Sequence, residues 1–220
     1  DEVLSVYGGD NTTFQYCIMS EACSGSHKFG GIWGNDYSTY HHNLFAHNAS
    51  RNPRWTSNGS GNNDYRNNVT YNWGYNTCYG GSGGDLFNMV ANYYKPGPAT
   101  ESGVRDRIAS PNGGGWYVAE NYLDGFPDVT ADNWLGVIPH YWETIDRDVD
   151  AVPGLRLETP SEYMPINQQT AEAAYESVLE HAGCSKPNRD SHDARIVEEI
   201  RTGTATHGNG FVSSPTELPT

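Results

Sequence analysis

The sequence predicts an all-β solenoid, specifically a right-handed parallel β-helix with a C-terminal capping loop and helices. Three observations support this class: short strand-like segments repeat along the chain, their period lies in the twenties, and Gly, Asn, Thr and Tyr are abundant relative to Leu and Lys. The chain opens at "DEVLSVYGG", which is already strand-like. We interpret this as an internal start, so that the solenoid is incomplete at its N-terminus.

The repeated segments organise residues 1–125. They read "TTFQYCIM", "YHHNLFAHN", "DYRNNVTYNW", "LFNMVANYYKPG" and "GWYVAENYLDG". Aligning Cys17, Asn43, Asn67, Asn92 and Asn121 gives steps of 26, 24, 25 and 29 residues. One strand-rich unit without an intervening helix favours a parallel β-helix. The leucine-rich pattern is absent, and a β-sandwich remains the alternative. We expect each corner Asn to bond to the neighbouring coil and to adopt a left-handed turn.

Residues 126–220 are less periodic. Residues 126–169 contain Pro and aromatic side chains and predict an irregular excursion packed on the solenoid, held by Trp134, Tyr141 and Trp142. Residues 170–206 predict a helical cap over an end of the solenoid. Its first helix has Thr170 as N-cap and Ala174, Val178 and Leu179 on one face, and it stops at Gly183. The second buries Ala194, Ile196, Val197 and Ile200 and ends at Gly203, and residues 207–220 predict a flexible tail.

Charge is distributed unevenly in this acidic chain. The formal net charge is −14, and residues 126–220 contain 6 Lys and Arg against 16 Asp and Glu. Within residues 27–66 the net charge is positive, because basic residues outnumber acidic ones. The basic residues are Lys28, Arg51, Arg54 and Arg66, and the acidic residues are Asp36 and Asp64. The overall sign argues against a nucleic-acid partner. No apolar run is long enough to predict a membrane span. A local cationic site on an acidic body instead predicts a carboxylate or sulfate ligand, with a metal assisting.

The four cysteines are Cys17, Cys23, Cys78 and Cys184. They form no CxxC pair and have no zinc-finger spacing. The polar, Asn-rich composition is typical of extracellular proteins and favours one or two disulfides, with Cys17–Cys23 as the local pair. Four buried thiols are the alternative.

The stretch "YHHNLFAHNASRNPRW" places Arg51 and Arg54 around an Asn-Pro step at the end of a strand. It follows "HKFGGIWG" and precedes "DYRNNVTYNW". This order resembles polysaccharide lyase family 1, the pectate lyases, over residues 1–125: a Lys in a Gly-rich segment, a "YHHN" strand, R-x-P-R, then "NN-x-Y-x-N-W". The segment "AYESVLEHAGCSKPNRDSHDARIVEEI" resembles the ending of many secreted members.

The resemblance implies that the solenoid coils carry an active site for β-elimination on polygalacturonate. Arg51 would act as the base, while Lys28 and Arg54 would bind substrate carboxylates. Cationic side chains suit this chemistry because the substrate carboxylate gains negative charge as the C5 proton leaves. A guanidinium pKa above about 12 makes an arginine base demanding, and a crowded cationic site and alkaline pH would help. We interpret His27, His41, His42 and His47 mainly as packing residues, with adjacent strand histidines on opposite faces.

The resemblance also implies a calcium cofactor. Calcium takes oxygen ligands and would bridge substrate carboxylates to protein acids. Aligning "DEVLSVYGGDNTT" with the family pattern places Asp1 at one metal-binding position and Ser5 at another, where the family has an acid. Ser5 is no equivalent, so we expect Asp1 to contribute to an incomplete site, with Glu2 as a possible substitute.

Three alternative functions stay open at this point. A polygalacturonase requires clustered Asp residues, and residues 1–125 contain no suitably spaced group. A pectin lyase acts on methyl-esterified substrate without calcium and favours an aromatic cleft, for which Trp33, Trp55 and Trp73 are candidates. A non-catalytic glycan-binding β-helix is the third. We expect a secreted, extracellular or periplasmic monomer whose partner is an acidic polysaccharide, neither nucleic acid nor membrane.

Overall fold

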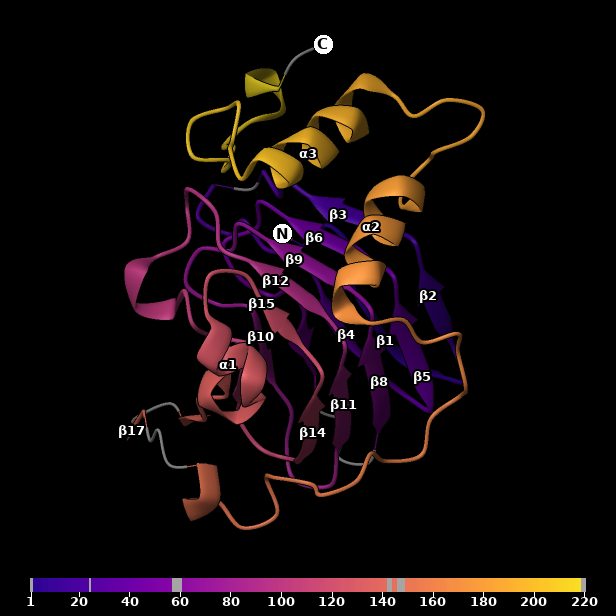
Figure 1. Ribbon diagram of the computed structural model, residues 1–220, viewed down its shortest axis with the longest axis vertical. Coiled ribbons are helices and arrows are strands. Elements are labelled where there is room, and N and C mark those ends of the chain that lie inside the picture. The colour runs from indigo at the N-terminus through magenta and orange to yellow at the C-terminus, as the bar shows by residue number, and fades with distance from the viewer. Residues whose placement is uncertain (1, 24, 57–60, 142–143, 146–148, 219–220) are drawn as a thin grey trace.

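The computed structural model describes residues 2–23, 25–56, 61–141, 144–145 and 149–218. Three five-stranded sheets wind around a common core (Figure 1). In spatial order, the first sheet contains β1 (Val6–Asp10), β4 (Ile32–Asp36), β7 (Arg54–Trp55), β10 (Cys78–Gly80) and β13 (Ala109–Pro111). The second contains β2 (Thr13–Gln15), β5 (Ser38–His41), β8 (Asn62–Arg66), β11 (Leu86–Val90) and β14 (Gly115–Ala119). The third contains β3 (Ile18–Ser20), β6 (Leu44–Ala46), β9 (Val69–Tyr71), β12 (Tyr93–Lys95) and β15 (Tyr122–Leu123).

Every pairing within these sheets is parallel and joins strands of successive coils. The register is regular: β8 and β11, for example, pair over five residues from Asn62 with Leu86 to Arg66 with Val90. The predicted parallel β-helix is therefore confirmed, and the β-sandwich alternative is wrong. Only the short pair β16 (His140–Tyr141) and β17 (Thr144–Ile145), in the excursion, is antiparallel among the described strands.

An asparagine ladder connects the coils, and it corrects one position of the predicted alignment. The backbone N–H of Asn43 donates to Oδ1 of Asn68 at 2.9 Å, so Asn68 and not Asn67 is the stacked residue on that coil. The same bond repeats along the column, from Cys17 to Asn43 and onwards through Asn92, Asn121 and Asn133. The amides satisfy backbone donors that the corners would otherwise bury unpaired.

The left-handed residue of each corner is the one before the ladder residue. These residues are Tyr16, His42, Asn67, Ala91 and Glu120, with φ between 51° and 60°. The expectation that the ladder asparagines themselves are left-handed is therefore wrong. Asn67 shows the difference, since its side chain donates to the carbonyls of Ala91 and Gln169 and does not join the ladder.

The interior of the solenoid is filled by stacked aromatic side chains. Trp33 and Trp55 occupy paired positions on β4 and β7, and both are at most 1% exposed. Trp33 also stacks on Tyr40 of the second sheet, with ring centroids 4.8 Å apart. Parallel, in-register coils place identical kinds of residue above one another, so each large ring is covered by the next coil.

The helices cover a face of the solenoid. Helices α2 (Ala171–His181) and α3 (Ser191–Thr202) pack their apolar sides on outward residues of the third sheet, including Leu44, Val69 and Tyr71 (Figure 1). We expected them to cap an end. As predicted, the Thr170 hydroxyl caps α2, and Gly203 ends α3 with φ 71°. On α3, however, Ala194 is exposed, whereas Glu199 is buried.

The first residues of the excursion pack on the coil that ends at β15. Helix α1 (Pro127–Ala131) contacts β15, and the 3-10 turn η2 (Asn133–Gly136) supplies the last ladder residue, Asn133. Trp134 packs against the core cluster and under Arg156. The side chains of Tyr141 and Trp142, the other two predicted anchors, lie outside the described residues. Three further 3-10 turns are η1 (Ser102–Val104), η3 (Val149–Ala151) and η4 (Pro215–Glu217).

The structure shows the state of the four cysteines, the position of the C-terminal segment and the character of the helices. Cys17, Cys23, Cys78 and Cys184 all have free thiols, so the expected Cys17–Cys23 disulfide is not formed. The segment for which we predict flexibility contacts the solenoid, and Val212 within it is fully buried. Among the helices of the described chain, none has the length and apolarity that crossing a bilayer requires.

Candidate active site

The three cationic residues singled out in the sequence lie on two adjacent coils, at the entrance to the first sheet. The N–H of Ala49 donates to the carbonyl of Lys28 at 2.7 Å, and the N–H of Gly31 donates to the carbonyl of Arg51 at 2.8 Å. Arg54 then begins β7 and pairs with Ile32 of β4. The fold therefore places Lys28 on the coil next to the one that carries Arg51 and Arg54, although 23 residues separate Lys28 from Arg51 in the sequence.

Arg51 has the most constrained geometry of the three. Its φ is 61°, a left-handed conformation that is uncommon outside Gly and Asn and that often marks functional sites. It precedes the cis Asn52–Pro53 bond. Its guanidinium lies over the ring of Phe29, 4.2 Å from the centroid, and forms an ion pair with Glu2. The side chain is 17% exposed, and its buried Nε has no partner among the described residues.

Lys28 is held by a residue from the far end of the chain. Its Nζ donates to Oγ of Ser213 at 2.9 Å. The segment that presents Ser213 is docked by Val212, which is buried, and by Gly210, where a Cβ would lie 2.2 Å from Nδ1 of His47. Because the partner is a neutral hydroxyl, the charge of Lys28 is not neutralised by an acid among the described residues.

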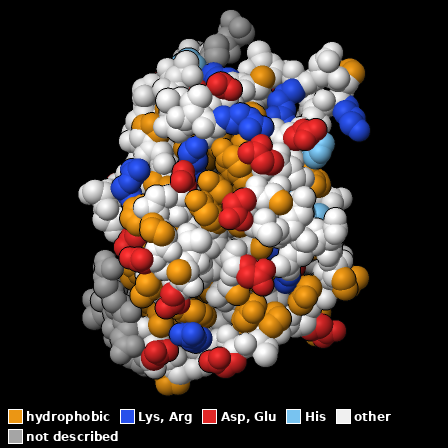
Figure 2. Space-filling view, in the orientation of Figure 1, with side chains coloured by type: hydrophobic (Ala, Val, Ile, Leu, Met, Phe, Trp, Pro, Cys, Tyr) orange, Lys and Arg blue, Asp and Glu red, His pale blue; other side chains and the backbone are white. Residues whose placement is uncertain are grey.

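Arg54 occupies an outward position on β7, since its neighbour Trp55 points into the core. It is half-buried and makes no ion pair with any residue that the structure describes. Two cations of the site thus lack an acidic partner in a chain with net charge −14, whose acidic side chains are scattered over the face in Figure 2. Such a site favours an anionic ligand.

Arg66, the fourth basic residue of the segment 27–66, is not part of this site. Its guanidinium binds both carboxylate oxygens of Asp64, at 2.5 and 2.6 Å, and lies under Tyr163 and Gln168 of the excursion. Arg66 is on the second sheet, so it adds no free charge to the site.

His41 and His42 lie at the second sheet, away from the three cations, whereas His27 directly precedes Lys28 and stacks on the ring that Arg51 covers. His41 and His42 share an Nδ1–Nδ1 contact of 2.8 Å at a corner of the second sheet. Their predicted placement on opposite faces is wrong, because the strand ends at His41 and His42 is left-handed. Burial, then His42 and Arg66, lower the pKa of His41 to about 4. His47 is buried beside Glu199 of α3, and His27 stacks on Phe29.

The described residues do not by themselves form a calcium site. Asp1, the predicted ligand, lies outside them, and Ser5 uses its hydroxyl to accept from the N–H of Ile32. Glu2 is the carboxylate that lies beside Arg51, and no group of three His, Cys, Asp or Glu residues in the described chain could hold a metal ion. Calcium ordinarily takes six to eight oxygen ligands, so one carboxylate falls short.

The structure bears on two of the alternative functions. Trp33, Trp55 and Trp73 are at most 1% exposed, so they cannot form the aromatic cleft suggested for a pectin lyase. Asp10, Asp36 and Asp85 line a cavity of about 170 Å³ at a corner of the coils, a grouping that the sequence did not predict. Asp36 and Asp85 accept hydrogen bonds from loop backbone amides, which accounts for them as turn residues.

Sequence reasoning left out three residues that contact the cations. Phe29 and Ser213 carried no signal, since an isolated aromatic residue and a serine in a presumed tail are common. Glu2 was considered only as a metal ligand, whereas it pairs with Arg51. The bridges from Glu2 to Phe29 and from Phe29 to Ser50 explain the pairing, because they stack these three positions on successive coils.

No family model matches the chain. Curated relatives do match it. A protein of Aspergillus terreus named "Probable pectate lyase C" is 32% identical over 211 residues, which is 92% of this chain and 46% of the relative. Its namesakes in Aspergillus fumigatus and Emericella nidulans are each 31% identical over 208 residues, covering 92% and 91% of this chain and 46% and 44% of theirs.

The chain thus spans about half the length of the curated relatives it matches. The similarity extends over the solenoid, the excursion and the helices, since more than nine-tenths of the chain is aligned. Together with the parallel β-helix, this similarity over about half of the relatives' length supports the assignment of the chain to the pectate lyase family.

Proposed function

We propose that this chain carries the substrate-binding cations and the base of a lyase that cleaves polygalacturonate by calcium-assisted β-elimination. The observation that carries the proposal is the cluster of Lys28, Arg51 and Arg54 on adjacent coils, two of them without an acidic partner in the described chain. A polyanionic chain is the ligand that such a cluster favours. The names of the relatives support this substrate class.

The reaction requires that one residue remove the C5 proton while others stabilise the charge that develops on the adjacent carboxylate. Neutral Arg51 takes the C5 proton, a double bond forms between C4 and C5 as the C4–O bond breaks, and the departing oxygen takes a proton from water. Lys28 and Arg54 bind uronate carboxylates through charge-assisted hydrogen bonds. Arg51 pairs with Glu2 and lies over the Phe29 ring. Because a guanidinium must lose a proton before it can act as a base, we expect alkaline pH to favour turnover.

Replacing Arg51 by Lys tests the assignment of the base. Arg51→Lys keeps the positive charge but removes the planar fork. We expect turnover of polygalacturonate, followed by the ultraviolet absorbance of the unsaturated product, to fall about 10²- to 10⁴-fold, as for other general bases. Near-normal turnover with an unchanged circular dichroism spectrum would remove Arg51 from the role of base. Product formation on methyl-esterified pectin at full rate in chelator would instead favour a pectin lyase.

We propose further that calcium and the oligosaccharide bind together. Because the described chain offers one carboxylate near Arg51, calcium would draw its other oxygen ligands from Asp1 and from the substrate, and binding without sugar should be weak. By linkage, each ligand should tighten the other by the same factor. Calorimetric titration of calcium into the Arg51→Lys variant, with and without trigalacturonate, tests this. Equal calcium affinities in the two titrations would contradict the shared-ligand proposal.

We also propose that the protein is secreted and acts as a monomer on an extracellular acidic polysaccharide. The acidic composition and the kind of polysaccharide acted on support this. Size-exclusion chromatography with light scattering tests the monomer, and fractionation of the producing culture tests secretion.

A further inference from the structure

The coil that follows the two arginines presents tyrosines where the preceding coils present cations. Tyr79 on β10 pairs with Arg54 on β7, so the two residues are direct neighbours on the outward side of the first sheet. Tyr75 donates its N–H to the carbonyl of Ala49, two residues before Arg51, at 3.0 Å. The tyrosines therefore continue the site by one coil, a step of about 4.8 Å.

Both tyrosines are accessible, unlike the four buried tyrosines of the described solenoid, which are Tyr40, Tyr65, Tyr71 and Tyr94. Tyr75 is 42% exposed and Tyr79 is half-buried, whereas Tyr65 and Tyr94, on the second and third sheets, are fully buried in the core. Burial of part of the ring raises the pKa of Tyr75, against the influence of its hydrogen bond with Ser50 and of the nearby Arg51. Tyr75 precedes β10 on the same coil that carries Tyr79.

This coil also lacks positive charge. The sequence contains no Lys or Arg between Arg66 and Lys95. Lys95, the first cation after the gap, is on the third sheet, where its Nζ donates to the carbonyl of Ile200 in α3. A uronate bound over Tyr75 and Tyr79 would consequently find no cation on this coil.

We propose that Tyr75 and Tyr79 form a saccharide subsite that accepts a methyl-esterified uronate next to the unesterified unit bound by Lys28, Arg51 and Arg54. The faces of a sugar ring are lined by C–H groups and pack on aromatic rings, whose faces carry partial negative charge. A free carboxylate is disfavoured against such a face, whereas its methyl ester is neutral and loses less hydration on burial. The substrate class is therefore partially methyl-esterified pectin, an inference that takes the polysaccharide from the proposed function.

Binding measurements test the subsite independently of catalysis. The probes are trigalacturonate and the same trimer with methyl esters on some of its carboxylates, titrated calorimetrically into the unmodified chain and its Tyr79 variants. We expect Tyr79→Ala to weaken binding of the esterified trimer about fivefold to tenfold, and Tyr79→Phe to leave it within about twofold, because the ring is the contact. Tyr79→Arg should shift the affinity ratio of the two trimers about tenfold towards the unesterified one.

Matched variants separate a local contact from a general loss of stability. Tyr37 has the same 42% exposure as Tyr75 but follows β4 at another corner, so Tyr37→Ala is the control for Tyr75→Ala. Tyr117, half-buried on the second sheet, is the control for Tyr79. We expect both controls to bind like the unmodified chain.

The outcomes also separate this inference from the proposed function. An unchanged affinity ratio in Tyr79→Arg, or a failure of the unmodified chain to bind either trimer, overturns the subsite. Formation of unsaturated product by the unmodified chain, together with an unchanged ratio, removes the subsite and leaves the lyase proposal standing. If Tyr79→Arg shifts the affinity ratio as expected but the unmodified chain forms no unsaturated product, the subsite stands and the lyase proposal is contradicted.

Discussion

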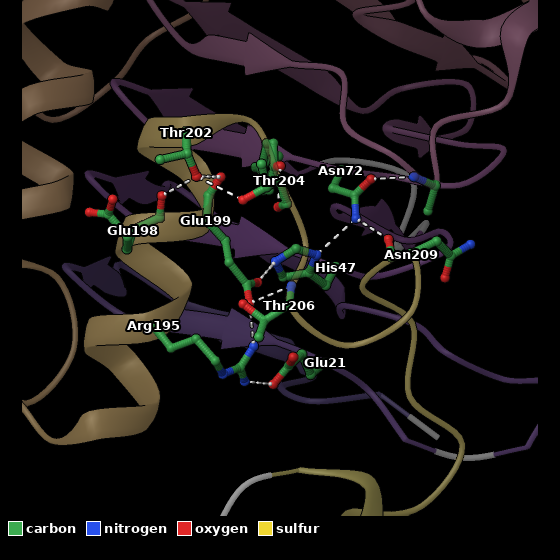
Figure 3. Close-up of polar contacts among 12 residues, drawn as sticks. Glu21, His47, Asn72, Arg195, Glu198, Glu199, Thr202, Thr204, Thr206 and Asn209 are labelled. Carbon is green, nitrogen blue, oxygen red and sulfur yellow. Dashed lines mark hydrogen bonds and ion pairs between the residues drawn. The ribbon is translucent and has the colours of Figure 1, made fainter.

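Arginines at the entrance to the first sheet and under α3 have opposite environments. Arg195 of α3 donates to Glu199 at 2.9 Å and to Glu21 at 2.7 Å, so two buried carboxylates surround it (Figure 3). Arg54, which is also half-buried, has no acidic partner in the described chain. Residue type alone therefore does not show which cations can bind an anionic ligand, because nearby acids neutralise Arg195 and leave Arg54 available.

The network under α3 includes further residues of the solenoid and of the C-terminal segment. Glu199 also contacts Nε2 of His47 at 2.8 Å and accepts from the N–H of Thr206, while Asn72 joins Nδ1 of His47 to the carbonyl of Asn209 (Figure 3). Each member fixes another element against the solenoid: α3, the segment after it, and the turn that leads to Arg51. We therefore interpret this network as structural, with an indirect effect on the active site.

Matched Arg→Gln variants give the largest expected contrast. Arg195→Gln removes the arginine from the buried carboxylates of Glu21 and Glu199 and leaves each with only a histidine as ion-pair partner among the described residues. We therefore expect a loss of about 3–5 kcal/mol in the free energy of unfolding. Arg54→Gln should change that free energy by less than about 0.5 kcal/mol and should weaken binding of oligogalacturonate. Urea unfolding and calorimetry measure the two quantities. Equal destabilisation by both variants would contradict the inference that Arg195 is structural and Arg54 is available to a ligand.

The ionisation of Glu199 gives a pH dependence of intermediate size. Burial acts to raise the pKa of Glu199, but hydrogen bonds from His47, Thr206 and Arg195 outweigh it and hold the pKa well below its usual range. A carboxyl with a lowered folded-state pKa stabilises the fold fully above its unfolded pKa, about 4.3. The stabilisation then decreases as the pH falls from that value through the folded pKa.

Glu199→Gln should therefore flatten the acid side of the stability profile, by about 2 kcal/mol between pH 6 and pH 3. Glu198→Gln is the control, because the Glu198 side chain is exposed on the same helix. Urea midpoints measured across this range give the comparison. Parallel profiles for the two variants would show that Glu199 does not carry the effect.

The smallest expected effect concerns the contact between the two regions. Ser213→Ala removes the hydrogen bond to Nζ of Lys28 and frees that side chain to move. We expect KM for polygalacturonate to rise about threefold with little change in kcat, since one neutral hydrogen bond is worth about 0.5–1.5 kcal/mol. Ser213→Thr keeps the hydroxyl and should restore KM. An equal loss in both variants would point to general damage of the segment and not to the position of Lys28.

Some of the architecture could be predicted because it depends on local repetition. A period in the twenties with a recurrent Asn required stacked coils, and Thr170 and Gly203 marked helix ends by capping chemistry that involves only a few neighbouring residues. The alignment error at Asn67 also comes from reliance on a local pattern. The dipeptide "NN" offers two candidates, and only the register of β9 against β6 selects Asn68.

The composition and motifs of the sequence determined the class of fold, the acidic balance and the candidates Lys28, Arg51 and Arg54. Tertiary structure decided which charges remain available. It paired Arg66 with Asp64 and Arg51 with Glu2, left Arg54 without an acid among the described residues, and brought Ser213 to Lys28 across 185 positions of the chain. It also moved the three tryptophans into the core and turned Tyr75 and Tyr79 outward. The physical reason is that periodicity and capping are local properties, whereas the energy of a charge depends on burial and on neighbours that only the folded chain assembles.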